Sequence, residues 1–275
     1  MRPGPDVEVV ELEPGDLVAA GALIARVWGV PDGRGFIDIH TFRAYLLAGE
    51  PLLGAFVPGR AHDPTALLGA SIGFVGTHPG GMHIHSHVTG VEPTHQHRGV
   101  GAALKLAQRD WALARGITEV RWTFDPLVAR NAFFNLTKLG ARGVTYHVNV
   151  YGEMPDATNA GDESDRVEAV WDLTEPVGRP EPDLDALMTA GAAVILSLDG
   201  EVWPEARLVP VLLACVPSDI VVVRHADPAA GQRWRRAARA AIGRALDLGY
   251  AATGATRDGW WVLEAGPGAH RNEAE

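Results

Sequence analysis

The alternation of hydrophobic and polar residues predicts strands and helices in turn along the chain. Residues 7–13 (VEVVELE) alternate with the period of a half-buried strand. After Asp16, a good helix N-cap, apolar residues recur at helical spacing through LVAAGALIARVWG. Up to residue 151 we expect these further elements: a short helix at 39–47, strands at 52–57, 66–75 and 81–91, a helix at 101–114, a strand at 119–124, a helix at 129–139 and a strand at 144–151.

The rest of the chain repeats this mixture after a break. Residues 153–183 are first polar and then rich in proline, which predicts a loop or linker. Beyond them, AAVILSLDG and IVVVRHAD have the composition of strands, and YAATGAT with WWVLEA is typical of a closing pair of strands. Between these, the helix after Pro228 places on one face Trp234, Ala238, Ala241, Ala245 and Leu248. The pattern favours an α/β fold with a C-terminal α/β extension.

Composition narrows the class of protein. The 275 residues are 47 % hydrophobic and 21 % charged, and the formal net charge of −10 argues against a general nucleic-acid binder. No apolar run approaches the roughly 20 residues that span a bilayer, and the first residues lack the apolar stretch of a signal peptide. The single cysteine, Cys215, lies in an apolar run and is expected to be a buried, unreactive thiol. We expect a cytoplasmic protein with no nucleic-acid or membrane partner, and a homodimer stays open.

The most informative segment is residues 88–116, in which a strand ends at Val91 and a turn with Gly99 and Gly101 leads into a helix. Glycines at the start of a helix let backbone N–H groups approach an anion, and the helix dipole adds to the attraction. A P-loop is excluded because Ala102 and Ala103 follow Gly101 where Lys and Ser or Thr are needed. A dinucleotide fingerprint is excluded because it needs three spaced glycines. The segment therefore predicts a site for a diphosphate.

The residues around these glycines resemble a known family. Val91-Glu92-Pro93 followed by Gln96–Gly101 strongly resembles motif A of the GNAT N-acyltransferase superfamily, and Asn131 with Lys138–Ala141 resembles the second half of its fold. The resemblance covers residues 7–151 and, with later segments, extends to a longer, two-part branch of predicted acetyltransferases. It implies a mixed, splayed central sheet flanked by helices. The domains implied are a GNAT acyl-CoA-binding domain at 1–152, a linker at 153–183 and the extension at 184–275.

The resemblance also implies an activity, in which acetyl-CoA or another acyl-CoA donates its acyl group to the amine of a small molecule or amino acid by direct attack. The backbone N–H of Val91 would polarise the thioester carbonyl. The coenzyme A site implied comprises Val91, Gln96, His97, Arg98, Gly99, Val100, Gly101, Ala102 and Asn131. Two alternatives stay open: a succinyl-CoA-dependent amino-acid N-succinyltransferase, and a regulatory protein that binds coenzyme A without turnover.

Candidates for the general base lie beside the motif. His83, His85 and His87 alternate along one strand, so they share one face, and an imidazole titrates near neutral pH. His85, His87 and Glu92 are the candidate bases. The three histidines also resemble a metal site, but no carboxylate or fourth ligand is evident at ligand spacing, and we expect no metal.

The general acid and the acceptor site are less defined. Many members of the superfamily place a tyrosine where this chain has Leu136, which cannot donate a proton and is the one feature that favours the non-catalytic alternative. Tyr146 and Tyr151 are substitutes. The resemblance places the acceptor near four residues, of which the arginines would bind a carboxylate: Trp28, Arg43, Asp125 and Arg130.

Overall fold

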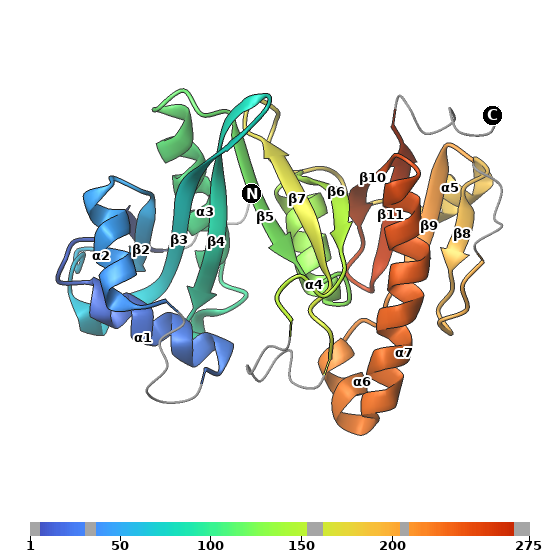
Figure 1. Cartoon of the computed structure of the whole chain (residues 1–275), viewed down its shortest axis with the longest axis horizontal. Coiled ribbons are helices and arrows are strands. Elements are labelled where there is room, and N and C mark those ends of the chain that lie inside the picture. The colour runs from blue at the N-terminus through green and yellow to red at the C-terminus, as the bar shows by residue number, and fades with distance from the viewer. Residues whose placement is uncertain (1–5, 31–36, 153–161, 204–208, 267–275) are drawn as a thin grey trace. The chain divides into compact units, whose positions relative to one another are not determined.

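The computed structural model describes residues 6–30, 37–152, 162–203 and 209–266. The chain forms two compact units that divide between Arg121 and Trp122, inside strand β5 (Glu119–Phe124). The first unit holds the chain up to Arg121, and the second holds most of the remainder. The two units are described separately below (Figure 1).

The first unit is a sheet covered by helices on both faces. Its strands follow the order β1-β2-β3-β4-β5, where β1 to β4 are antiparallel and β5 runs parallel to β4. The strands preceding β5 are β1 (Glu8–Glu11), β2 (Leu52–Phe56), β3 (Leu67–His78) and β4 (Gly81–Val91). The helices are α1 (Leu17–Trp28), α2 (Ile39–Leu47) and α3 (Val100–Leu113), with short 3₁₀ turns η1 (Pro64–Ala66) and η2 (Pro93–His95).

Two apolar cores hold these layers together. On one face, α1 and α2 pack on Leu52, Ile72 and Val88. On the other, Val100 and Leu104 of α3 pack on Leu53 and Ala55 of β2 and on Leu68 of β3. Asp16 does precede α1, as predicted, but its carboxylate accepts from the Glu13 N–H at 2.8 Å instead of capping the helix.

Strand β4 contains an irregularity that its sequence pattern did not predict. Val88 pairs with Ile72 of β3 and Ser86 pairs with Gly73, so β4 has one residue more than β3 at this point, and that residue is His87. A β-bulge of this kind turns the strand and re-aims its side chains. The expected alternation over His83–Val88 therefore breaks at the bulge: Val88 joins the α1 core, whereas Ser86 contacts α3.

The second unit builds a mixed sheet with the strand order β7-β6-β10-β11-β9-β8. Its strands are β6 (Arg142–His147), β7 (Arg166–Asp172), β8 (Ala193–Leu196), β9 (Val211–Cys215), β10 (Tyr250–Ala255) and β11 (Trp260–Ala265). Helix α4 (Ala129–Ala132) continues as the π-helical stretch η3 (Phe133–Lys138). Helices α5 (Leu184–Thr189) and α6 (Ile220–Ala226) precede α7 (Pro228–Ala238), which continues through η4 (Arg239–Gly243) into α8 (Arg244–Asp247).

Three expectations from the sequence are wrong in this half. Residues 153–183 are not all linker, because β7 lies within them and pairs with β6. The segment IVVVRHAD is helix α6 and not a strand, since Asp219 caps it by accepting from the N–H groups of Val221 and Val222. Residues 184–275 do not separate from those before them, because Ala252 of β10 pairs with Gly143 of β6.

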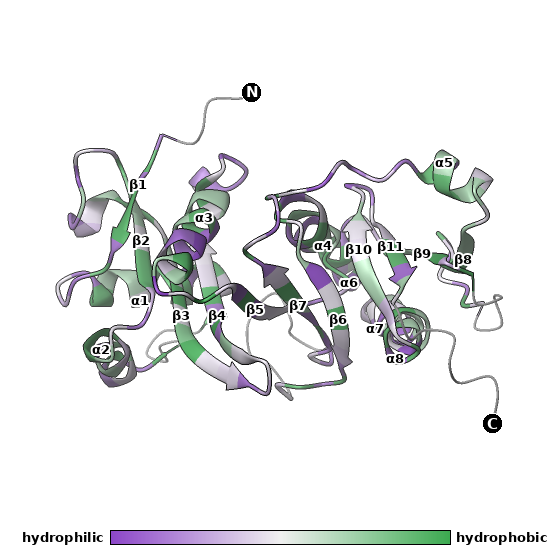
Figure 2. Cartoon of the chain, turned by 90° about the horizontal axis from the view of Figure 1, so that it is seen from above, coloured by the Kyte–Doolittle hydropathy of each residue, from purple (hydrophilic) through white to green (hydrophobic). Residues whose placement is uncertain are grey.

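The predicted α/β class, with a mixed sheet flanked by helices, is confirmed. Apolar residues run along the strands, and hydrophilic residues gather on part of α3 and in the connection before α5 (Figure 2).

Cys215 is buried as expected, and burial raises the pKa of its thiol to about 12. Within the described ranges, every helix is too short or too polar to cross a bilayer.

Candidate functional site

Strands β4 and β5 pair over a short stretch only. The recorded pairs are Ile84 with Val120 and His85 with Arg121, both inside the first unit. Strand β3, in contrast, pairs with β4 as far as Val91. The last part of β4 is therefore held by β3 along one edge, while the parallel pairing with β5 has already ended.

The backbone of Val91 faces away from β3. The next residue, Glu92, donates its N–H to the Leu68 carbonyl of β3 at 2.9 Å. Because the polar groups of successive strand residues point to opposite edges, the N–H and carbonyl of Val91 point the other way. The Val91 carbonyl accepts from the side-chain amide of Gln96 at 3.3 Å, which agrees with this direction and positions the start of the loop.

The loop between β4 and α3 has the backbone of an anion site. His97 and Gly99 adopt left-handed conformations, with φ of 62° and 88°. Such turns direct successive N–H groups toward one point. The first backbone bond into α3 runs from the Ala103 N–H to the Gly99 carbonyl at 2.9 Å. The N–H groups of the first helical turn, at Val100, Gly101 and Ala102, thus stay at the mouth of the helix, where the dipole favours an anion.

Gly101 leaves space at this mouth. A Cβ on Gly101 would meet only the Val91 side chain, at 3.8 Å. The open side of Gly101 therefore faces the end of β4. These donors, backbone N–H groups at a helix start without a lysine, fit the diphosphate of coenzyme A. The structure brings together the predicted residues from Val91 to Ala102 in one unit.

Two of the candidate bases lie on the α1–α2 side of β4. The His85 ring lies 4.9 Å from the Phe74 ring and 6.1 Å from the His87 ring, measured between centroids. Loss of hydration lowers the pKa of His87 below the ordinary value of 6.5. The His87 imidazole is therefore neutral at physiological pH and able to accept a proton.

The third candidate base, Glu92, is held in an ion pair with Arg26 of α1. The Glu92 side chain is 24 % exposed, and the Arg26 side chain is 57 % exposed. The Glu92 carboxylate is therefore already engaged by a guanidinium, whereas the His87 imidazole is neutral. Among the three candidates, the geometry favours His87.

A buried lysine, Lys105, lies behind the strand and was not among the predicted residues. Lys105 of α3 is 5 % exposed, and its Nζ donates to Ser86 Oγ of β4 at 2.8 Å. Burial lowers the pKa of this amine to about 7. The only signal in the sequence is a lysine directly after Leu104 on the inward side of α3. Helical periodicity alone does not distinguish such a residue from one that reaches the surface.

The remaining predicted residues lie in different places. Trp28 ends α1 and packs against the α1 core, and Arg43 is exposed on α2. Arg130 and Asn131 are exposed in α4, which belongs to the second unit. Asp125 also belongs to the second unit, but it is buried.

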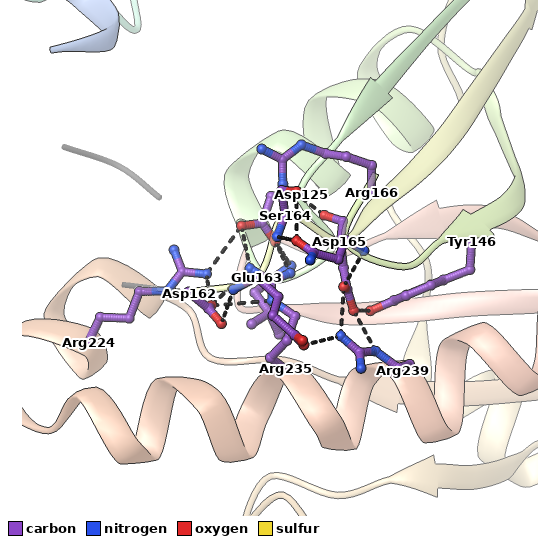
Figure 3. Close-up of polar contacts among 12 residues, drawn as sticks. Asp125, Tyr146, Asp162, Glu163, Ser164, Asp165, Arg166, Arg224, Arg235 and Arg239 are labelled. Atoms are coloured by element: carbon purple, nitrogen blue, oxygen red, sulfur yellow. Dashed lines mark hydrogen bonds and ion pairs between the residues drawn. The ribbon is translucent and has the colours of Figure 1, made fainter. Parts of the chain in front are cut away.

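Both oxygens of Asp125 are bound by arginines (Figure 3). Arg235 of α7 donates to them at 2.8 and 2.9 Å, and Arg224 of α6 donates to one at 3.2 Å. Burial alone would raise the pKa of Asp125, but Arg235 and Arg224 hold it at about 2. Asp125 is thus occupied within the fold, and its predicted contact with an acceptor finds no support in this geometry.

The same network engages other residues of the second unit. Arg224 and Arg235 also bind Asp162, at 2.7 and 3.0 Å. Arg239 donates to both oxygens of Asp165, at 2.8 and 2.9 Å. Arg235 of α7 and Arg239 of η4 therefore bind buried acidic residues of their own unit.

The network borders a cavity of about 540 Å³ in the second unit, lined by Asn149, Gly152, Asp162, Glu163, Gln232, Arg235, Arg236 and Arg239.

Leu136 and Tyr146 are both unsuited to act as a general acid. Leu136 is fully buried in η3. The Tyr146 hydroxyl donates to Asp165 at 2.8 Å, and burial together with this carboxylate raises the pKa of Tyr146 well above its usual range. The Tyr151 hydroxyl lies 2.9 Å from that of Thr123. A tyrosine with a raised pKa is a weak acid, so Tyr146 is unsuited to protonate a leaving thiolate.

No protein-family model matches this sequence, and no curated protein does. Three solved structures illustrate what it is similar to. The NatC complex bound to Gag peptide and CoA covers 61 % of this chain and 98 % of its own, at 16 % identity and a TM-score of 0.48. The match to the ribosomal-protein-S18-alanine N-acetyltransferase from Escherichia coli covers 64 % of this chain and 99 % of that enzyme's chain, at 16 % identity and a TM-score of 0.46.

The third, yncA from Salmonella typhimurium with its cofactor acetyl-CoA, covers 65 % of this chain and 98 % of its own, at 17 % identity and a TM-score of 0.47. At TM-scores below 0.5 these likenesses carry no functional conclusion. The function of this chain rests on the geometry of its own site.

Proposed function

We propose that this protein is a cytoplasmic, acyl-CoA-dependent N-acyltransferase of the GNAT superfamily. The observation that carries the proposal is that the first unit presents two groups of backbone N–H donors on consecutive elements, β4 and α3. A strand end presents the Val91 N–H away from its neighbour β3, and ten residues later the N–H groups of a helix start converge on one point. A thioester carbonyl and a diphosphate need these two kinds of donor.

Acyl-CoA would supply an activated thioester. The Val91 N–H would donate to the thioester oxygen and stabilise the negative charge that develops there during attack. Such a donor contributes roughly 3–4 kcal/mol in enzymes where it has been removed. The loop at His97–Gly99 and the first turn of α3 would hold the diphosphate, and Gln96 would keep the Val91 carbonyl turned aside.

His87 would take the proton from the attacking amine. It sits at the bulge of β4, close to the strand end that carries Val91, and its lowered pKa keeps it neutral. His85 packs beside it and would keep its ring in place. Because Leu136 has no proton and Tyr146 is bound to Asp165, we propose that water protonates the departing thiolate.

The acceptor is proposed to be a small-molecule amine or amino acid. Arg43 supports this assignment because it is exposed on α2, the helix that covers the same face of the sheet as the imidazoles. A guanidinium of this kind binds a carboxylate through two hydrogen bonds. The same property would serve a succinyl donor, so acetyl and succinyl transfer are both tested below.

The test is the release of free coenzyme A, detected as thiol, from acetyl-CoA and succinyl-CoA in the presence of amino acids and simple amines. The proposal predicts thiol release that requires an acceptor, and mass spectrometry should show the acylated amine. Tight binding of acyl-CoA without acceptor-dependent release across the panel would instead favour the non-catalytic protein, which Leu136 allows.

A further inference from the structure

A cluster of two histidines and a glutamate lies on β3, β4 and β5, at the end of β4 opposite to Val91. His78 ends β3, His83 lies near the start of β4, and Glu119 begins β5, all in the first unit. Each offers one ligand atom, and these atoms lie within 4.8 Å of one another. We propose that these three residues bind a divalent transition metal of the zinc class. The site is independent of the proposed acyl transfer.

The hairpin leaves room for the two imidazoles. His83 pairs across the hairpin with Gly76, and a Cβ on Gly76 would lie 2.7 Å from the His83 ring. A Cβ on Gly80 would likewise lie 2.8 Å from the His78 ring. Each ring thus occupies the space that a side chain at a neighbouring position would fill. The two rings lie with their centroids 5.5 Å apart, both half-buried.

The register of the sheet brings the carboxylate to them. The parallel pairing of Ile84 with Val120 places His83 and Glu119 side by side one residue earlier. Glu119 Oε1 lies 3.3 Å from His78 Nε2. Two ligands at about 2.0–2.1 Å from a tetrahedral zinc ion lie roughly 3.4 Å apart, so this pair already has the required spacing. The other ligand atoms lie within 4.8 Å of one another, and rotation about side-chain torsions would bring them to the same spacing on binding.

Arg121 supports the carboxylate from the next position on the same face of β5. Its Nε lies 2.5 Å from Glu119 Oε1. A hydrogen bond from outside the coordination sphere fixes the orientation of a ligating carboxylate. Glu119 keeps its second oxygen and further lone pairs for a metal.

The ligand set selects the class of metal. Two imidazole nitrogens and one carboxylate suit zinc and its neighbours in the first transition row, whereas calcium and magnesium prefer oxygen ligands throughout. Three protein ligands leave a fourth position for water. From the sequence we expected no metal, because no carboxylate stands at ligand spacing from the histidines. Glu119 comes from a different strand, which spacing along the chain cannot reveal.

The site would tie three strands together where β4 and β5 are paired, away from Val91. Binding to the folded state alone raises its stability by mass action. The test uses tag-free protein, stripped of metal with a chelator. Zinc chloride is titrated by calorimetry, and thermal unfolding is followed with and without it. We expect one equivalent to bind and the unfolding temperature to rise.

Variants assign the ligands. His78→Gln, His83→Gln and Glu119→Gln should each weaken zinc binding by at least about 10–100-fold, the range seen when even outer-shell partners are removed. His85→Gln is the matched control, because it removes an imidazole from the same strand face outside the cluster, and it should keep the wild-type affinity. Circular dichroism confirms that each variant is folded before titration.

Cobalt(II) provides a second readout that does not depend on folding stability. In the proposed site it should give the intense visible absorption of a four-coordinate ion, and His83→Gln should abolish it. The proposal is overturned if wild-type protein shows no saturable zinc binding. It is equally overturned if His85→Gln loses as much affinity as His83→Gln.

Discussion

At the level of single residues, the bulge in β4 gives the three imidazoles different positions. A regular strand would give His83, His85 and His87 equivalent positions on one face. Instead, His87 is the extra residue of the bulge, whereas His83 pairs with Gly76 beside His78 and Glu119. The alternating pattern predicted the shared face correctly over residues 83–87. It could not predict the bulge, because that depends on how β3 pairs with β4.

The role that we propose for His87 predicts a specific pH profile. Replacing it by glutamine keeps a side chain of similar size but removes the proton acceptor, so kcat/KM should fall about 10²–10⁴-fold. In the wild type, kcat/KM should rise with pH through the lowered pKa of His87, below 6.5, and stay level above it. The His87→Gln profile should lose this limb. An unchanged limb in the variant would assign the base elsewhere, and Glu92→Gln tests that candidate in parallel.

At the level of elements, α7 is fixed to its unit by buried ion pairs. Asp125 follows β5 directly, and Arg235 is 1 % exposed in the middle of α7. From the sequence we assigned Asp125 to the acceptor, because a charged residue that binds a ligand and one that binds a distant part of the chain look alike in sequence. The pairing is visible only once the fold has brought together residues far apart in the chain.

Breaking this pair should cost stability. Asp125→Asn leaves Arg235 buried without its main counter-charge, and the free energy of unfolding should fall by about 3–5 kcal/mol. Arg233→Gln, which breaks the exposed Arg233–Asp227 pair on the same helix, should leave the free energy of unfolding nearly unchanged, because water and salt screen an exposed pair. Denaturant unfolding of both variants measures the difference. Equal losses would show that the buried pair has no special weight.

The ionisation of Asp125 also predicts how the free energy of unfolding changes at acidic pH. The pKa of Asp125 is about 2 in the folded protein, below its ordinary value of 3.8. The ion pairs of Asp125 therefore contribute fully to stability at pH values above 3.8, and this contribution is lost as the pH falls toward 2.

At the level of the whole molecule, the sequence predicted the order of elements better than the division of the chain. Most strands and helices up to residue 139 fall within a few residues of their predicted bounds, because their apolar periodicity is strong. The boundary at 152 was wrong as a division between compact units. Thr137 Oγ1 donates to the Ala255 carbonyl at 2.6 Å, and Arg239 binds Asp165, so residues on both sides of the expected linker belong to one unit.

This division predicts the behaviour of a truncated chain. A fragment ending at residue 183 loses β10, which pairs with β6. It also loses α7 and η4, whose Arg235 and Arg239 bind Asp125 and Asp165. It should unfold without the cooperative transition of the full chain and bind a hydrophobic dye. Thermal unfolding and dye fluorescence compare the two proteins. A fragment with a sharp, native-like transition would show that 184–275 is a separate domain after all.

The proposed function requires that β4, its loop and α3 bind acyl-CoA. The most direct measurement is calorimetric titration of acetyl-CoA and succinyl-CoA into wild type, Gly101→Glu and Leu106→Glu. Gly101 has open space before it, so glutamate there keeps the fold but brings a negative charge to the diphosphate position. Leu106 is 40 % exposed on the same helix, and glutamate there adds the same charge away from the mouth. The account predicts binding to wild type and Leu106→Glu and none to Gly101→Glu. Absence of binding to wild type, or equal binding to all three, would contradict it.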